Sequence, residues 1–197
     1  MCDFTLYDTI ALKPFKGNLM RKTLIITGLI AFLLLAAVLF WAVRSSQRAN
    51  LLWEAAENEV SVTVEVVRHP AGQLQLLAKF TPTREHFHLY SKDLPKSGVE
   101  GLGRPTLIEI VSPFGAIRPT GALTAYQPTH DLSFESLGLI FPVYPEGAVT
   151  LGLPFEFISA DGVDSVELSV TYMSCSDQIC LAPVVDRRFT VNIPRNP

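Results

Sequence analysis

Residues 23–43 contain no charged side chain, and this segment limits what the rest of the chain can fold into. At a rise of about 1.5 Å per residue, a helix over it is about 30 Å long, which matches the hydrocarbon core of a bilayer. A cleaved signal peptide is the alternative, but its apolar region is shorter and ends in small residues, whereas Phe40 and Trp41 are bulky. We therefore expect one uncleaved transmembrane helix over residues 23–43.

The positive charges beside this segment predict its orientation. Four lysines and arginines lie within residues 13–22, whereas only Arg44 and Arg48 follow the segment closely. The positive-inside rule then places the N-terminus in the cytoplasm. We expect residues 1–22 to form a cytoplasmic tail and residues 44–59 to form a partly helical juxtamembrane linker. The rest of the chain is expected in the periplasm or outside the cell, held by its own helix to the inner (cytoplasmic) membrane.

Residues 60–197 have the length of one domain, and their pattern predicts β-strands. Val60, Val62, Val64 and Val66 alternate with polar residues, as in a strand with one buried face. A turn signal at residues 69–72 and a second apolar-rich run then indicate a hairpin. The remaining strand candidates are residues 86–91, 106–111, 149–157, 166–172 and 188–193.

About seven short strands, broken by glycine and proline and without crossover helices, favour an all-β fold. We expect an immunoglobulin-like antiparallel sandwich, preceded by the single transmembrane helix. Residues 112–145 are poorly periodic and rich in proline. We expect long loops there, covering the functional site.

Charge and motifs exclude several classes of function. The net charge is −3, and no basic stripe is present, so nucleic acid is not an expected partner. No phosphate-binding glycine loop, hydrolase nucleophile motif or paired carboxylate signature appears in the sequence. We therefore predict no cofactor.

Two cysteines lie in the predicted domain, Cys175 and Cys180, and in an oxidising compartment they are expected to form a disulfide. A permanent disulfide in a structural or binding module is one interpretation. A loop this short contributes only about 2 kcal/mol by chain entropy, against about 4.7 kcal/mol for a loop of 100 residues, which weakens that interpretation. The pair also follows a predicted strand end, where a sulfur can be presented for thiol-disulfide exchange. Spacing alone leaves both alternatives open.

A metal carrier is a further alternative, because His86 and His88 alternate on one side of a predicted strand. Together with Cys175 and Cys180 they offer two imidazoles and two thiolates, which suit zinc or copper. The spacing matches no established zinc pattern, so no metal ligand is assigned.

Two stretches resemble a known family. Residues 172–183, with a tyrosine, a cysteine, a short polar loop, a second cysteine and a proline, are similar to the cysteine segment of the N-terminal periplasmic domain of the thiol:disulfide interchange protein DsbD. Residues 86–95 and 101–106 resemble the early strand and following loop of the same family, also called disulfide bond corrector. The resemblance covers about residues 60–194.

This resemblance implies a domain that relays reducing equivalents from a thioredoxin-like donor domain to oxidised periplasmic thiol proteins. Cys175 and Cys180 then form the redox pair, with Cys180 forming mixed disulfides and Cys175 resolving them. By the same likeness Tyr90 and His88 flank the cysteines, and Phe134 is the candidate for a shielding aromatic ring. The electron-conducting and thioredoxin-like domains of full-length DsbD have no counterpart in this sequence. We therefore expect a separate membrane thiol reductase or thioredoxin-like protein to supply the electrons.

Overall fold

The structure, a computed structural model, describes residues 32, 34, 35, 50–69, 71–112, 117–134, 138–158, 165–195 and 197. The chain divides into two compact units, Met1–Ser46 and Gln47–Pro197. In the first unit only Phe32, Leu34 and Leu35 are described, and they are helical and exposed. The predicted tail and the rest of the predicted anchor lie outside the described residues. No described helix has the length and apolar character needed to span a bilayer.

The described residues of the second unit are all-β, and every strand pair is antiparallel. The strands are β1 (Leu51–Glu57), β2 (Val60–Arg68), β3 (Leu74–Pro82), β4 (His88–Leu89), β5 (Leu107–Ser112), β6 (Ile117–Pro119), β7 (Thr124–Ala125), β8 (His130–Phe134), β9 (Leu139–Val143), β10 (Val149–Phe157), β11 (Ser165–Tyr172), β12 (Ser174–Cys175) and β13 (Val184–Asn192). The all-β prediction is confirmed for this part of the chain.

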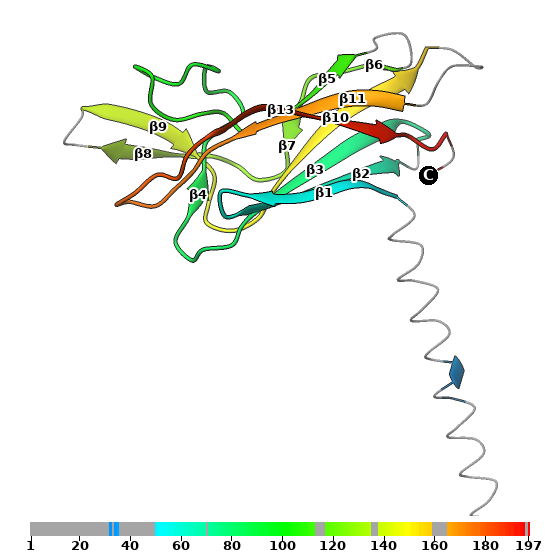
Figure 1. The fold of residues 1–197 in the computed structure, drawn as a ribbon, viewed down its shortest axis with the longest axis horizontal. Helices are drawn as coiled ribbons and strands as arrows, with labels where there is room; N and C mark the ends of the chain where they lie inside the picture. Colours follow the sequence, from blue (N-terminus) through cyan, green and yellow to red (C-terminus); the bar gives the residue numbers. More distant parts are fainter. Residues whose placement is uncertain are drawn as a thin grey trace, which may run out of the picture. The chain divides into compact units, whose positions relative to one another are not determined.

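Two sheets enclose one hydrophobic core, which we call the main core (Figure 1). The larger sheet has the order β1-β2-β3-β10-β6, with β7 also paired to β10, and the smaller has the order β13-β11-β5. The alternating valines of β2 point inward and are at most 1% exposed, as their period of two predicts. Apolar residues of β3, β10 and β11 complete the main core.

The sheet begins before the predicted domain boundary at Val60. Leu51–Glu57, expected as a partly helical linker, is strand β1 and pairs with β2 through a tight turn at Asn58 and Glu59, which both have positive φ. Two side chains of β1 also contact β13, near the far end of the sequence. Trp53 stacks on Phe189 of β13 at 3.9 Å between ring centroids, and Glu57 forms an ion pair with Arg187. The local sequence around the glutamates of β1 does not show these contacts.

The prediction of long loops over residues 112–145 was wrong, because the described part of this stretch contains β6, β7, β8 and β9. Two of the prolines in this stretch, Pro119 and Pro142, occupy strand positions where a missing N–H is tolerated. Pro119 ends β6, and Pro142 in β9 uses its carbonyl oxygen to accept a hydrogen bond from the N–H of Ser91 at 2.8 Å.

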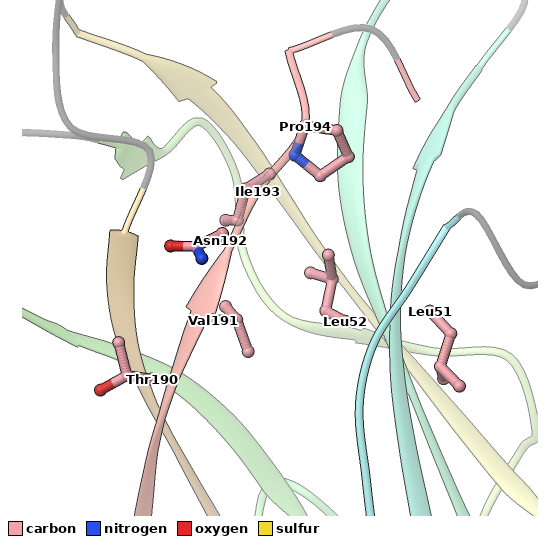
Figure 2. Close-up of a pocket in the computed structure, with 7 residues that line it drawn as sticks. All are labelled: Leu51, Leu52, Thr190, Val191, Asn192, Ile193 and Pro194. Atoms are coloured by element: carbon pink, nitrogen blue, oxygen red, sulfur yellow. The ribbon is translucent and has the colours of Figure 1, made fainter.

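A groove lies at the end of strand β13, and the two cysteines lie near its start. The groove has a volume of about 550 Å³ and lies where the start of β1 meets the end of β13 (Figure 2). Nine residues of β13 span about 30 Å between its start at Val184, close to Cys180 in sequence, and its end at Asn192. In Figure 1 that end of β13 lies on the right, whereas β4, β8 and β9 lie on the left.

Candidate functional site

Cys175 and Cys180 form a disulfide that closes a short hairpin after β11. The two residues face each other in an antiparallel bridge, with 4.1 Å between their Cα atoms. The N–H of Ser176 donates to the carbonyl oxygen of Ile179 at 2.8 Å, and the Ser176 hydroxyl oxygen accepts from the N–H groups of Gln178 and Ile179 at 3.2 Å. The serine side chain thus fixes the turn and holds the cysteines opposite each other.

The two cysteines differ in exposure. Cys175 lies in β12 and is 0% exposed, because β4 covers it on one side and Cys180 on the other. Cys180 lies on the outer arm of the hairpin and is exposed. Cys180 is therefore the more accessible of the two residues, and accessibility is what thiol-disulfide exchange requires.

Tyr90 contacts the disulfide directly. Its buried hydroxyl donates to Sγ of Cys175 at 3.2 Å and lies 3.8 Å from Sγ of Cys180. Burial raises the pKa of Tyr90, so the hydroxyl keeps its proton near neutral pH and remains a donor. The hydroxyl of Thr106 donates to the carbonyl oxygen of Tyr90 at 2.7 Å and fixes the backbone.

His88 lies directly opposite Cys175 in the β4–β12 pair. Its ring meets the ring of Tyr90 edge-on, with 5.9 Å between centroids, and the side chain is buried. Burial lowers the pKa of His88; the carboxylates of Asp177 and Glu146 oppose that shift, and His130 adds to it. The imidazole is therefore neutral at neutral pH.

A chain of aromatic rings extends from Tyr90 into the β8–β9 hairpin. Tyr90 meets Phe141 and Phe141 meets Phe134, each edge-on at 5.5 Å between centroids. Tyr90 also forms a backbone bridge to Val143, which ties β9 to β4. Phe134 is thus joined to the disulfide region through two rings, and its shielding role stays a prediction.

These side chains form a second apolar group, the site cluster, separate from the main core. Its buried members are Tyr90, Leu94, Phe141, Val143 and Cys175. The sequence did not single out Phe141 and Val143, although the short apolar run over residues 139–143 has the length of a buried strand and could have indicated one.

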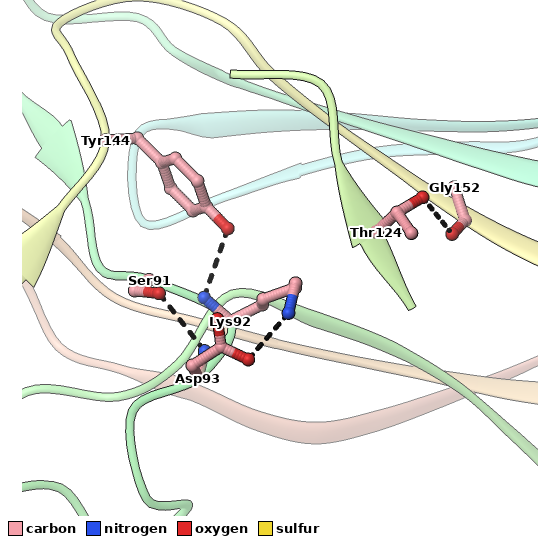
Figure 3. Close-up of polar contacts among 6 residues, drawn as sticks. All are labelled: Ser91, Lys92, Asp93, Thr124, Tyr144 and Gly152. Carbon is pink, nitrogen blue, oxygen red and sulfur yellow. Dashed lines mark hydrogen bonds and ion pairs between the residues drawn. The ribbon is translucent and has the colours of Figure 1, made fainter. Parts of the chain in front are cut away.

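The turn after β4 joins the site cluster to the main core (Figure 3). Tyr144 belongs to the main core, and its hydroxyl oxygen accepts a hydrogen bond from the backbone N–H of Lys92 at 3.1 Å. The N–H of Asp93 donates to the Ser91 hydroxyl at 3.2 Å, and the Lys92 ammonium contacts the Asp93 carboxylate at 2.6 Å. Nothing in the local sequence marks Tyr144 as the residue that holds this turn.

An open cleft of about 430 Å³ lies beside the cysteine hairpin. Residues 85–87 line one side and residues 176–179 the other. Ile179, next to Cys180 in the chain, is 51% exposed, which is unusual for a large apolar side chain. Solvent and other molecules therefore have free access to the outer arm of the hairpin.

The structure separates the two histidines that the metal-carrier alternative places together. His86 lies outside β4, has positive φ, and contacts the Glu146 carboxylate at 3.2 Å on the surface. His88 is buried beside Cys175. Among the residues that the structure describes, no group of three or more histidines, cysteines, aspartates or glutamates is placed to hold a metal ion. The premise of that alternative, that His86 and His88 share one side of a strand, is not met, because β4 begins only at His88.

No protein-family model matches the chain, and no curated protein matches it either. Among solved structures, it is similar to the N-terminal periplasmic domain of ScsB from Proteus mirabilis, with a TM-score of 0.42 and 14% identity over 72% of this chain and 49% of that one. It is also similar to the N-terminal domain of DsbD from Neisseria meningitidis, with a TM-score of 0.36 and 14% identity over 74% and 86%.

A third similar structure is the GAE domain of GGA2p from Saccharomyces cerevisiae, with a TM-score of 0.34 and 12% identity over 73% of this chain and 97% of that one. The chain spans about half the length of the ScsB structure that it matches. The DsbD domain, which residues 172–183 resemble in sequence, is thus among the structural neighbours of this chain.

Proposed function

We propose that this protein carries out thiol-disulfide exchange with other proteins through Cys175 and Cys180. The asymmetry of the pair is the observation that carries the proposal. Cys180 is an exposed residue, whereas Cys175 is fully buried beside a tyrosine hydroxyl that donates to its sulfur. A disulfide that served only as a staple needs neither an exposed partner sulfur nor a hydrogen-bond donor at the buried one.

Exchange at this site proceeds in two stages. A thiolate of a reducing donor attacks Sγ of Cys180, the Cys175–Cys180 bond breaks, and Cys175 leaves as a thiolate that accepts the Tyr90 hydrogen bond. The second thiolate of the donor then attacks the donor sulfur that is bonded to Cys180. This attack breaks the mixed disulfide and frees Cys180 as a thiolate, which takes a proton from solvent. The donor is oxidised to a disulfide and this protein gains two electrons.

The reduced protein then transfers these electrons. In the reduced protein both cysteines are thiols, because Cys175 has also taken up a proton from solvent. Cys180 returns its proton to solvent and attacks a client disulfide as a thiolate, which forms a mixed disulfide and releases one client sulfur as a thiolate. Cys175 then gives up its proton, attacks Sγ of Cys180 as a thiolate, re-forms the Cys175–Cys180 bond and releases the second client sulfur. The two client thiolates take up protons. The client is thereby reduced to two thiols. Because Cys175 is covered, it acts only within the protein, which supports the assignment of Cys180 as the attacking and Cys175 as the resolving residue.

The setting belongs to the same proposal. The donor is a thioredoxin-like domain or a membrane thiol reductase, and the clients are oxidised periplasmic thiol proteins. Residues 23–43 anchor the protein in the inner membrane with the N-terminus in the cytoplasm, and the all-β unit is an immunoglobulin-like sandwich facing outward. His88 and Tyr90 flank the sulfurs, and Phe134 shields them through Phe141.

Trapping tests the proposal. In the full-length Cys175→Ser variant, Cys180 remains free to attack but nothing resolves the product, so client proteins should stay attached through bonds that reductants release. The matched control is Cys180→Ser, in which Cys175 is covered and should capture no protein; both variants carry Cys2→Ser. If neither variant captures a partner in the cell envelope, the disulfide is a permanent staple.

The reduction potential gives a second measurement. Exchange proteins have potentials of roughly −120 to −270 mV, whereas structural disulfides fall below about −300 mV. We expect Cys175–Cys180 in the exchange range. A value in the structural range contradicts the proposed function.

A further inference from the structure

His88 is a buried titratable group that the exchange steps above do not use. Its side chain is 6% exposed, and its Nε2 has no hydrogen-bond partner among the described residues. A buried polar atom without a partner costs about 1–3 kcal/mol, so such atoms are rare in folded proteins. In the disulfide form, no hydrogen bond from a described residue to Nε2 of His88 offsets this cost.

The backbone places the imidazole beside the buried sulfur. Directly opposed residues in an antiparallel pair share one face of the sheet, with Cβ atoms about 4.5–5.5 Å apart, and His88 opposes Cys175. Tyr90 follows β4, two residues after His88; its hydroxyl reaches the same sulfur, and its ring meets the His88 ring edge-on. The sulfur of Cys175 thus accepts from a hydroxyl, and His88 lies directly opposite Cys175 in the strand pair.

We infer that His88 is the proton acceptor for the thiol of Cys175 in the reduced protein. The inference rests on the proposed function and assigns one of its proton transfers. In the mixed disulfide between Cys180 and a client, neutral His88 takes the proton from the Cys175 thiol. The resulting thiolate attacks Sγ of Cys180, the Cys175–Cys180 bond forms, and the client sulfur leaves as a thiolate. The His88 imidazolium then releases its proton to that thiolate or to solvent, so atoms, charges and electrons balance.

The charges around His88 suit this cycle. Burial lowers its pKa, which keeps the ring neutral and able to accept a proton. Asp177, in the loop between the cysteines, and Glu146 favour the protonated ring, whereas His130 opposes it. A thiolate at Cys175 adds a negative charge next to the ring and stabilises the imidazolium, whereas the disulfide adds none. The proton is therefore taken up only when a thiol is present to supply it.

A chromogenic aryl disulfide separates the two sulfur reactions. The experiment uses the full-length chain with Cys2→Ser, so that only Cys175 and Cys180 remain as thiols. In the reduced protein, Cys180 attacks the reagent and releases a first coloured thiolate; Cys175 then resolves the mixed disulfide and releases a second. His88→Gln and His88→Phe should slow the second phase at neutral pH by about tenfold or more and leave the first unchanged. The pH midpoint of the second phase should rise by about one unit in both variants.

The matched control is His69→Gln, which changes a histidine in the β2–β3 turn outside the site cluster and should alter neither phase. A second phase with the same rate and pH midpoint in the parent and in both His88 variants overturns the role of His88. Absence of the first phase in the parent protein overturns the proposed function instead, so the two failures are distinguishable.

Discussion

The main core and the site cluster are built differently, although they lie in one compact unit. The main core fills the space between two sheets whose longest strands have nine residues, and the β2–β3 and β3–β10 pairings run without a register shift. The site cluster rests on β4 and β12, which have two residues each, on single bridges and on side-chain hydrogen bonds. Aliphatic residues dominate the first, whereas tyrosine, phenylalanine and cysteine dominate the second. Stability and reactivity therefore occupy separate regions.

We expect the largest loss of stability when a buried side chain of the main core is truncated. Phe80 is 0% exposed and packs edge-on against Tyr172, so Phe80→Ala should lower the free energy of unfolding by about 3–5 kcal/mol. Urea denaturation measures the loss. As a control, Ile140→Ala at a side chain that is 60% exposed should change it by less than about 0.5 kcal/mol. Equal losses in the two variants would show that the main core does not carry the stability.

A smaller effect is expected where the backbone touches the site cluster. Gly103 has φ of 74°, and an added Cβ would lie 3.0 Å from Leu94 and 3.3 Å from the Tyr90 ring. Gly103→Ala should cost about 1–3 kcal/mol in unfolding free energy and also slow reduction of the disulfide by dithiothreitol, because Tyr90 is displaced. Gly72→Ala is the control, since Gly72 has φ of 86° with no atom within 4 Å of an added Cβ. Gly72→Ala should strain the backbone but leave the rate of disulfide reduction unchanged.

Removal of the Tyr90 hydroxyl should alter the rate of disulfide reduction more than the free energy of unfolding. Tyr90→Phe removes the hydrogen bond to Sγ of Cys175, worth about 1 kcal/mol to the leaving thiolate, and should slow reduction about fivefold. Stopped-flow measurement of reduction by dithiothreitol tests this. Tyr144→Phe also removes the hydroxyl of a buried tyrosine, but one that accepts from the backbone N–H of Lys92 and has no contact with either sulfur among the described hydrogen bonds, and it should leave the rate unchanged. Equal rates for Tyr90→Phe and the parent contradict the assigned role.

The smallest expected effect is a pH dependence of stability. Burial lowers the pKa of His88 below its ordinary 6.5, so as pH falls below about 6.5 the unfolded chain binds a proton that the folded oxidised protein does not. The free energy of unfolding should therefore fall with decreasing pH in that window. In His88→Gln this decrease should be weaker, whereas in His69→Gln it should match the parent. Denaturation at several pH values compares the three proteins, and identical curves contradict the effect of burial.

The difference between the main core and the site cluster also explains which features the sequence could predict. The alternating valines of β2 and the apolar runs of β3, β10 and β11 indicated an all-β fold because each period of two reports its own buried face. β1 was missed because the side chains that contact Trp53 and Glu57, namely Phe189 and Arg187, lie near the other end of the chain. The cysteines could be named from their spacing and the family resemblance. Their unequal exposure depends on β4 covering Cys175, which no local pattern reports.

The unequal exposure of Cys175 and Cys180 has a kinetic consequence under the proposed exchange. Donor and client would each form a covalent bond to the same atom, Sγ of Cys180, so the two could not be attached at once. Each would depart before the other arrives, and turnover should follow a substituted-enzyme scheme with parallel lines in double-reciprocal plots.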